Sequence, residues 1–468
     1  MFRTRRPACV GRLNALVSLV AGLLLAALLG AGAASAADYV PGQVVVGYSA
    51  PPTPAVSADI SRQTGIPSAP AAPSPAPNTH VVDLPRGVSV ARALDRLRRQ
   101  RGVAYAVPNY IAHASGAWIP NDPGQGRAPR GWERMQWNFL PGIGVNAPGA
   151  WANLLADHRP GARGTTIAIL DTGVAYRNWQ RYERSPDFNR TQFVRPYDFV
   201  AHNRFPLDRE GHGTFVTGTI AESTNNGFGL TGLAYGASIM PVRILGADGT
   251  GDAATISRGI RYAATHGAQV INLSLEFSLD VTSSDIPDII SAIRFAHDRG
   301  VVVVAAAGNE GVEQIAYPAR APAVISVGAT TRDRCLADYS NGGQRLDLVA
   351  PGGGDDTTLL SDPLCHPSRN LPDISQYTFD DPSNPRRFGY PGGWYGTSMA
   401  APHVAAAAAL VIASGVIGRN PSPDKVLARL EQTAQPLGSA KPNQYYGYGL
   451  LDAGAATTRT VALARRAG

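Results

Sequence analysis

The stretch VVVVAAAGN, residues 301–309, is apolar up to its glycine and then ends on a polar amide. An unbroken apolar run of this length, rich in valine, predicts a strand that is buried on both faces, as in a parallel sheet. Four more short apolar runs predict strands of the same kind. They are Thr165–Leu170, Ile239–Leu245, Gln269–Leu275 and Val324–Ala329.

Segments with helical periodicity separate several of these runs. They are Ala254–His266, Ile289–Asp298 and His403–Ser414. Apolar strands that alternate with amphipathic helices predict an α/β fold, with a largely parallel central sheet and helices on both faces. We assign this fold to residues 115–468. Polar residues that follow its strands, or begin its helices, should lie where the loops form a cleft.

Residues 38–114 predict a separate, small α/β domain. Its predicted strands are Gln43–Tyr48, Thr79–Leu84 and Val103–Val107. Its predicted helix has an apolar face formed by Val90, Leu94 and Leu97. The Pro/Ala-rich stretch 50–77, between the first two strands, is interpreted as a flexible insertion.

The first 36 residues have the three parts of an export signal. A basic start with four arginines is followed by the apolar stretch Leu13–Leu29 and by the possible cleavage site Ala34-Ser35-Ala36. An uncleaved membrane anchor is the alternative, because the apolar stretch is nearly long enough to span a bilayer. The cleavage site favours a secreted protein, extracellular or periplasmic, with no stable membrane anchor.

The charge of the chain does not indicate a nucleic-acid partner. The formal net charge of +7 is the sum of +4 from residues 1–37 and +3 from residues 38–114, so the rest of the chain is neutral. Because the positive charge lies in segments that we expect to be removed, no nucleic acid is predicted to bind the mature protein.

Only Cys335 and Cys365 remain in the predicted mature chain, since Cys9 lies in the signal. Two cysteines in an exported protein favour one disulfide over two free thiols. Closing a loop of about 30 residues stabilises a fold by roughly 3–4 kcal/mol in the chain-entropy model.

Ser398 lies in the run GTSMAAPHV, residues 396–404. Small residues from Ala400 to Ala413 predict a helix with Pro402 in its first turn. The hydroxyl of Ser398 would then lie at a helix N-terminus, where the dipole favours developing negative charge. On its own the residue equally fits an ordinary helix cap. A serine nucleophile also needs a base, and an acid that orients the base.

Asp171 and His212 are the candidates for the acid and the base. Asp171 directly follows a predicted buried strand, where a carboxylate needs a partner such as a histidine. His212 lies between two glycines, which let the backbone approach closely, and opens a predicted helix over Phe215–Ala221. Taken singly, Asp171 also fits a strand-end turn and His212 an ordinary histidine.

Asn309 ends the predicted strand 301–309, so its amide can point into the cleft. Acyl transfer requires hydrogen-bond donors that are aimed at the tetrahedral oxyanion. The side chain of Asn309 and the backbone N–H of Ser398 are the predicted donors. A plain Gly-Asn turn is the alternative.

Three other classes of protein fit less well. An aspartic peptidase needs two carboxylates that share a proton, and only one Asp-Thr-Gly is present. A lipase or esterase of the α/β-hydrolase fold needs Gly-x-Ser-x-Gly and the order serine, acid, histidine, whereas Ala400 is the fifth residue here and the order is reversed. An inactive scaffold would not need all four chemical residues.

The segments ILDTG (169–173), GHGT (211–214) and GTSMAAPHV (396–404) resemble the Asp, His and Ser signatures of the subtilase family, and they come in the family's order. The resemblance spans about residues 130–456 and includes YPA (317–319) and VISVGA (324–329). It implies a subtilisin-like serine endopeptidase of protein or peptide substrates, which needs no cofactor for catalysis and is expected to be a monomer.

Residues 38–114 are similar to the family's propeptide, although the Pro-rich insertion departs from it. Such a propeptide assists folding and then inhibits the enzyme by laying its C-terminal tail in the cleft. The run YAVPNY, residues 105–110, matches the end of that module. Self-cleavage is therefore predicted between Ile111 and Pro120.

The resemblance also implies a pocket for the residue before the scissile bond. Its expected walls and floor are Ser274, Leu275, Glu276, Ala306, Ala307, Gly308 and Ala316. Family members usually have glycine where Glu276 stands, and a carboxylate at this rim would favour basic substrate residues. Structural calcium is also implied by the family, and candidate carboxylates are Asp198, Asp208, Asp355 and Asp356. They form no compact pattern of oxygen ligands, so the metal sites stay unassigned.

Overall fold

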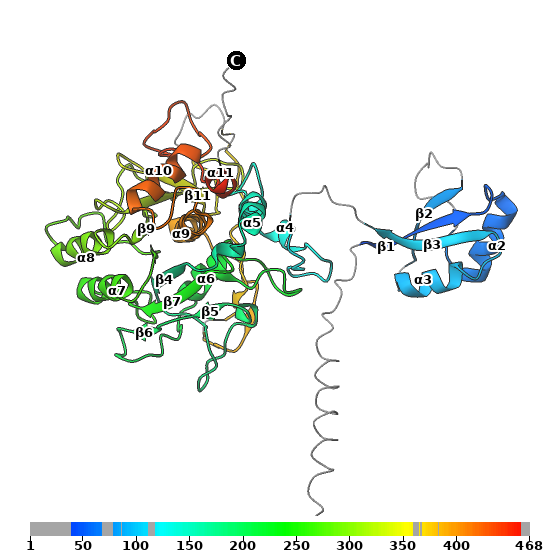
Figure 1. The fold of residues 1–468 in the computed structure, drawn as a ribbon, viewed down its shortest axis with the longest axis horizontal. Coiled ribbons are helices and arrows are strands. Elements are labelled where there is room, and N and C mark those ends of the chain that lie inside the picture. Colours follow the sequence, from blue (N-terminus) through cyan, green and yellow to red (C-terminus); the bar gives the residue numbers. More distant parts are fainter. Residues whose placement is uncertain are drawn as a thin grey trace, which may run out of the picture. The chain divides into compact units, whose positions relative to one another are not determined.

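The computed structural model describes residues 39–67, 78–85, 87–110, 118–358, 365, 367–381 and 383–459. The predicted export signal therefore lies outside the described residues, as does most of the predicted cleavage segment. The chain divides into two compact units, residues 1–113 and 114–468, drawn in Figure 1.

The first unit contains a three-stranded antiparallel sheet with strand order β2-β1-β3. The strands are β1 (Tyr39–Tyr48), β2 (Thr79–Asp83) and β3 (Val103–Tyr110). Helix α3 (Val90–Leu97) packs on the sheet through Leu94 and Leu97, as its apolar periodicity predicts.

A second helix of this unit, α2 (Pro54–Thr64), corrects the sequence interpretation. It lies in the first part of the stretch that we expected to be a flexible insertion. Thr53 caps it through its side chain, Pro54 occupies its first turn, and Ile60 is buried against the small core. A proline is favourable in the first turn of a helix. The composition of residues 50–77, taken alone, indicates a flexible insertion instead. Residues 68–77 lie outside the described residues.

The second unit is built on an eight-stranded sheet with the order β11-β10-β9-β8-β4-β7-β5, in which β6 also pairs with β7. All its strand pairs are parallel. The strands are β4 (Thr166–Asp171), β5 (Gln192–Phe193), β6 (Tyr197–Asp198), β7 (Ser238–Arg243), β8 (Val270–Leu273), β9 (Val302–Ala306), β10 (Ile325–Thr330) and β11 (Leu348–Pro351).

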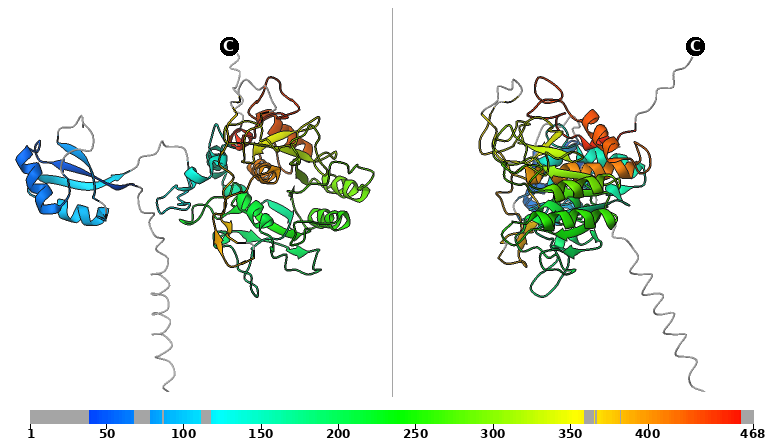
Figure 2. Two further views of the ribbon diagram at one scale, coloured as in Figure 1. Left: turned by 180° about the vertical axis from the view of Figure 1, so that it is seen from behind. Right: turned by 90° about the vertical axis from the view of Figure 1, so that its left-hand side faces the viewer.

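Helices cover both faces of this sheet, which confirms the predicted fold class (Figures 1 and 2). The longer ones are α5 (Ala147–Ala156), α6 (His212–Ala221), α7 (Ala253–Thr265), α8 (Pro287–His297), α9 (Thr397–Ser414) and α10 (Pro423–Thr433). Alternate residues of β4 pack against the helices on opposite faces of the sheet. Ile167 and Ile169 pack with α5, α6 and α9, whereas Ala168 and Leu170 pack with α7 and α8.

The remaining elements are short, and sequence periodicity did not predict them. They are α4 (Trp132–Met135), α11 (Ala453–Thr457), the 3-10 turns Trp137–Phe139, Pro160–Ala162 and Pro186–Phe188, and the hairpin strands β12 (Thr378–Phe379) and β13 (Phe388–Gly389). Two-residue strands are too short to show an alternation of side chains.

Helix α9 crosses the middle of the unit and contacts β8, β9, β10 and β11. It is long and apolar enough to span a membrane, but 83% of it is buried within the described fold. Its run of alanines lets the helix lie close against the sheet. We therefore describe it as a core helix.

Candidate active site

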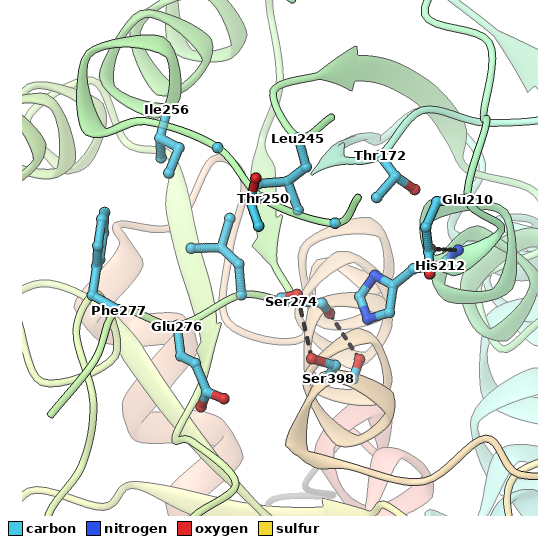
Figure 3. Close-up of a pocket in the computed structure, with 13 residues that line it drawn as sticks. Thr172, Glu210, His212, Leu245, Thr250, Ile256, Ser274, Glu276, Phe277 and Ser398 are labelled. Atoms are coloured by element: carbon cyan, nitrogen blue, oxygen red, sulfur yellow. Dashed lines mark hydrogen bonds between the residues drawn. The ribbon is translucent and has the colours of Figure 1, made fainter. Parts of the chain in front are cut away.

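The four residues singled out for chemistry lie at the ends of core elements. Asp171 is the last residue of β4, and His212 is the first residue of α6. Ser398 is the second residue of α9, and Asn309 follows the end of β9. The sheet and two helices thus bring together residues that are far apart in the chain. Figure 3 shows His212 and Ser398 in one cleft.

Asp171 and His212 are in direct contact. Nδ1 of His212 lies 2.8 Å from Oδ1 of Asp171, and this oxygen also accepts the backbone N–H of Thr172 at 2.7 Å. Asp171 is fully buried, whereas the His212 side chain remains 21% exposed. A buried carboxylate on one nitrogen of the imidazole leaves the other nitrogen free to exchange protons in the cleft.

The glycine after His212 is required by close packing. A Cβ on Gly213 would lie 2.1 Å from the carbonyl oxygen of Gly173 and 3.0 Å from the side chain of Asp171. Gly211, before the histidine, has φ of 112°, which residues with a side chain rarely adopt. The two glycines let helix α6 begin directly against the end of β4.

Ser398 is held at the start of α9 by Ser274. The Oγ of Ser398 donates to the carbonyl of Ser274 at 3.3 Å, and the Oγ of Ser274 donates to the carbonyl of Ser398 at 2.8 Å (Figure 3). Ser274 follows β8, so the predicted strand 269–275 ends two residues early. The hydrogen bonds of Ser274 thus link the segment after β8 to helix α9.

The amide of Asn309 is oriented by Thr397, a residue that sequence reasoning missed. Oδ1 of Asn309 accepts both the backbone N–H of Thr397 at 2.8 Å and its hydroxyl at 3.0 Å. The donor Nδ2 is left for other partners, and it contacts Oε1 of Glu276 at 3.3 Å. An amide fixed in this way is suited to donate to an oxyanion. In the sequence, the position of Thr397 directly before Ser398 was the signal that could have indicated this role.

Carboxylates surround the imidazole of His212. Burial opposes its protonation, but the charge of Asp171, their hydrogen bond, and the charges of Glu210 and Asp208 together raise the pKa of His212 to about 9. Glu210 also accepts the backbone N–H of His212 at 2.7 Å (Figure 3). Sequence reasoning did not single out Glu210, although it stands two positions before the histidine.

Three of the seven expected pocket residues line the cleft, and the other four are not among its lining residues. Ser274, Leu275 and Glu276 line the cleft together with His212 and Ser398. Ala306 ends strand β9, and Ala307 and Gly308 continue it in buried positions. Ala316 is also buried, and its N–H donates to the carbonyl of Ala307 at 2.8 Å.

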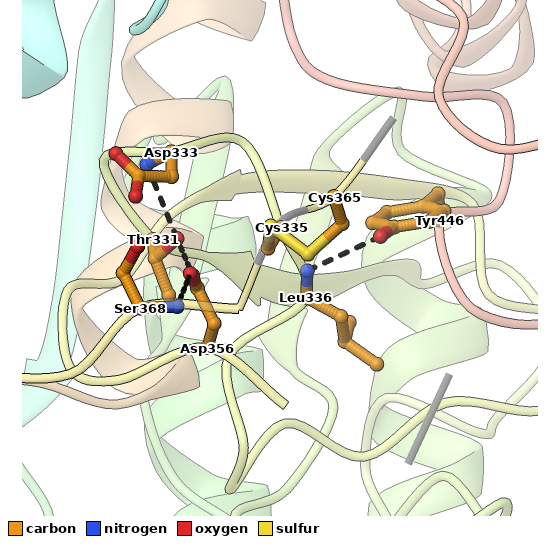
Figure 4. Close-up of a disulfide and its surroundings, with 8 residues drawn as sticks. All are labelled: Thr331, Asp333, Cys335, Leu336, Asp356, Cys365, Ser368 and Tyr446. Atoms are coloured by element: carbon orange, nitrogen blue, oxygen red, sulfur yellow. Dashed lines mark hydrogen bonds between the residues drawn. A yellow bond between two sulfur atoms is a disulfide. The ribbon is translucent and has the colours of Figure 1, made fainter. Parts of the chain in front are cut away.

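The predicted disulfide between Cys335 and Cys365 is present, with 5.3 Å between the Cα atoms (Figure 4). It lies next to Asp356, whose carboxylate bonds the hydroxyl of Thr331 and the N–H of Ser368. The bridge joins the segment after β10 to the loop that follows β11.

The candidate calcium ligands each bond to protein groups instead of converging on one point. Asp198 pairs with Arg243, Asp208 accepts from Thr214 and other groups, and Asp355 pairs with Arg369. A different group of buried carboxylates, which sequence reasoning missed, consists of Asp122, Asp187 and Glu222. Burial and their mutual repulsion raise the pKa of both Asp187 and Glu222.

Comparison with known proteins agrees with this architecture. A family model described as the subtilase family matches residues 162–449, and one for the fervidolysin N-terminal prodomain matches residues 27–109. The chain therefore belongs to the subtilase family of serine peptidases and carries an N-terminal prodomain.

Individual relatives are similar over much of their length. A thermophilic serine proteinase of Bacillus sp. (strain AK1) is 31% identical, over 90% of this chain and 88% of the relative. Subtilisin BL of Lederbergia lenta is 37% identical, over 63% of this chain and 91% of the relative. A solved protease structure from Pseudoalteromonas arctica aligns with a TM-score of 0.58 and 29% identity, over 73% of this chain and 99% of the other. The expected family, fold and class of enzyme are thus confirmed.

Proposed function

We propose that the protein is a secreted serine endopeptidase whose triad is Ser398, His212 and Asp171. The contact of 2.8 Å between Nδ1 of His212 and Oδ1 of Asp171, in the same cleft as Ser398, is the observation that carries the proposal. It supplies the oriented base that a serine nucleophile requires.

The proposed reaction is acyl transfer. His212 accepts the proton of the Ser398 hydroxyl as the oxygen attacks the substrate carbonyl, and Asp171 stabilises the resulting imidazolium. Nδ2 of Asn309 and the backbone N–H of Ser398 donate to the oxyanion. His212 then protonates the leaving amine, and water releases the acyl group from Ser398 by the reverse sequence.

The pocket for the residue before the scissile bond is proposed to lie between two walls. One wall is formed by Ser274, Leu275 and Glu276, and the other by Ala306, Ala307 and Gly308. Ala316 is proposed as its floor, where a small side chain leaves room for large substrate residues.

Labelling with a fluorophosphonate tests the proposed chemistry. The mature protein should react in a one-to-one ratio, and Ser398→Ala should not react at all. Ser274→Ala, which changes a serine in the same cleft, should still be labelled. Labelling of Ser398→Ala to the same extent, or no reaction of the unchanged protein, would contradict the proposal.

We further propose that the chain is made as an exported, self-processed zymogen. The prodomain match and the export signal in the sequence support this. N-terminal sequencing of the mature protein should give a start between Ile111 and Pro120, and the Ser398→Ala chain should stay unprocessed. A mature start elsewhere would refute the proposed cleavage site.

Structural calcium is also a proposal for this chain. Asp122, Asp187 and Glu222 are buried carboxylates whose combined negative charge a cation would offset. Their oxygens also accept hydrogen bonds from protein N–H groups, among them those of Asn225 and Leu230. A cation bound there would act on stability, since no catalytic step requires it.

A further inference from the structure

The side chain of Glu276, from one wall of the proposed substrate pocket, meets Glu310 beside Gly308 of the other wall. A Cβ built on Gly308 would lie 2.2 Å from Nδ2 of Asn341, 2.9 Å from Oε2 of Glu276 and 3.0 Å from Oε2 of Glu310. Two carboxylates therefore approach the same point beside the backbone of Gly308. Neither forms an ion pair with an arginine, lysine or histidine within the part of the chain that the structure describes.

The two carboxylates differ in how well their oxygens are satisfied. Oε2 of Glu310 accepts from Nδ2 of Asn341 at 2.5 Å and from the backbone N–H of Asn309 at 3.1 Å. Oε2 of Glu276 is buried and has no hydrogen-bond partner among the described residues. Burial, and then the charge of Glu310, raise the pKa of Glu276. Leaving a buried carboxylate oxygen without a donor is unfavourable, so the site favours a ligand that brings donors and positive charge.

Oε1 of Glu276 contacts the side-chain amide of Asn309, which we propose as a hydrogen-bond donor to the oxyanion. Nδ2 of Asn309 donates to Oε1 of Glu276 at 3.3 Å, while Oδ1 of Asn309 is held by Thr397. Nδ2 carries two N–H groups, so the amide can donate to Glu276 and to the substrate oxygen at the same time. Glu276 therefore lies directly beside the proposed oxyanion donor.

We propose that Glu276 binds the cationic side chain of a substrate lysine or arginine at the residue before the scissile bond. The proposal rests on the triad assigned above. The apolar walls at Leu275, Ala306 and Ala307 suit the methylene stem of such a side chain, and its charged end reaches the carboxylate. A guanidinium or ammonium group supplies the donors that Glu276 lacks.

The charge of the substrate residue should therefore affect catalytic efficiency. A substrate without the cation leaves Oε2 of Glu276 without a donor, whereas a lysine or arginine side chain pairs with it. Selectivity is then expected in kcat/KM, which compares how well two substrates are bound in the transition state.

Matched peptides that differ only at this residue test the inference. The series carries arginine, lysine, phenylalanine, and citrulline, which has the shape of arginine without its charge. We expect kcat/KM for arginine to exceed that for citrulline by about 10- to 100-fold. In Glu276→Gln the ratio should fall close to one.

Glu310→Gln is the matched control, because it removes the same charge from a carboxylate whose Oε2 already has its donors. It should change the logarithm of the arginine-to-citrulline ratio of kcat/KM by less than about a third of the change that Glu276→Gln causes. Equal effects of the two substitutions would overturn the inference, because the selectivity would then arise from the general negative charge of the cleft. Equal kcat/KM for arginine and citrulline in the unchanged protein would overturn it as well.

Titration of active sites with a fluorophosphonate separates this inference from the proposed function. A peptidase that titrates fully but shows no charge selectivity keeps the triad and loses the role of Glu276. A protein that does not titrate loses the triad assignment itself. Where Glu276→Gln gives a low titre, the same comparison is made with Glu276→Gly, which restores the usual family residue.

Discussion

The imidazole of His212 has more negative charge around it than its orientation requires. Asp171 holds the ring through Nδ1, and Glu210 and Asp208 add further negative charge near it. Each carboxylate favours the imidazolium over the neutral ring. Since the proposed general base must start neutral, these residues are expected to move the working range of the enzyme towards alkaline pH.

The orienting role of Asp171 is tested by Asp171→Asn. The amide keeps the shape of the side chain but does not stabilise the imidazolium, so kcat should fall by about 10⁴-fold. Burst kinetics with an ester substrate measure the acylation step directly. A loss below about tenfold would show that His212 does not depend on Asp171.

The pH dependence of kcat/KM follows from the raised pKa of His212. Activity should be lost as pH falls through that pKa, so the acid limb should lie above the ordinary value of 6.5, approaching about 9. Glu210→Gln removes one of the charges that favour the imidazolium, and the limb should move to lower pH. Glu313→Gln, whose carboxylate contacts Tyr445, is the control and should leave the limb in place. An acid limb that stays in place in Glu210→Gln would contradict the proposed effect of Glu210 on the pKa of His212.

At this scale the sequence predicted candidate catalytic residues but not the residues that hold them in place. Asp171, His212 and Ser398 could be predicted as candidates because each lies at the end of a strand or the start of a helix within a recognisable motif. Thr397 and Glu210 act through hydrogen bonds that join separate elements, and such contacts depend on tertiary packing. The unpaired oxygen of Glu276 likewise became evident only in three dimensions.

The start of helix α6 depends on packing against the end of β4. In Gly213→Ala the added methyl group would overlap the carbonyl of Gly173, so the helix and His212 must shift. We expect a loss of about 1–3 kcal/mol in the free energy of unfolding, together with a large fall in kcat. Gly392→Ala is a suitable control, because nothing lies within 4 Å of its added Cβ. Equal activity of the two variants would rule out this packing role.

The disulfide should stabilise the loop between β11 and the hairpin β12–β13. Replacing Cys335 and Cys365 by serine should lower the free energy of unfolding by roughly 3–4 kcal/mol. Chemical denaturation measures this change. Reductant should bring the unchanged protein to the stability of the double variant and leave the variant unaffected; a reductant effect on both would point to another cause.

Elements with clear periodicity could be predicted, and short or irregular ones could not. The core strands β4, β7, β8, β9 and β10 were predicted nearly to their ends, because strands buried on both faces require unbroken apolar runs. Helix α2 was missed because it lies in a proline-rich stretch, residues 50–77, whose composition is typical of linkers. Thr53, which caps this helix, was a local signal of a helix start.

Calcium should affect the stability of the whole peptidase unit. A cation near Asp122, Asp187 and Glu222 would relieve their repulsion, so added calcium should raise the melting temperature and a chelator should reverse the change. Asp187→Asn should reduce this increase, whereas Asp424→Asn, on the exposed start of α10, should not. An equal response of both variants would place the calcium elsewhere.

The order of the active-site residues along the chain has a consequence for the cell that makes this enzyme. Asp171 lies on the first strand of the parallel sheet, whereas Ser398 opens helix α9, which follows all the strands of that sheet. A ribosome or an export channel that still holds helix α9 therefore holds a polypeptide without the proposed nucleophile. Such a nascent chain is expected to be harmless to its surroundings, because the proposed chemistry requires Ser398 to fold against Asp171 and His212.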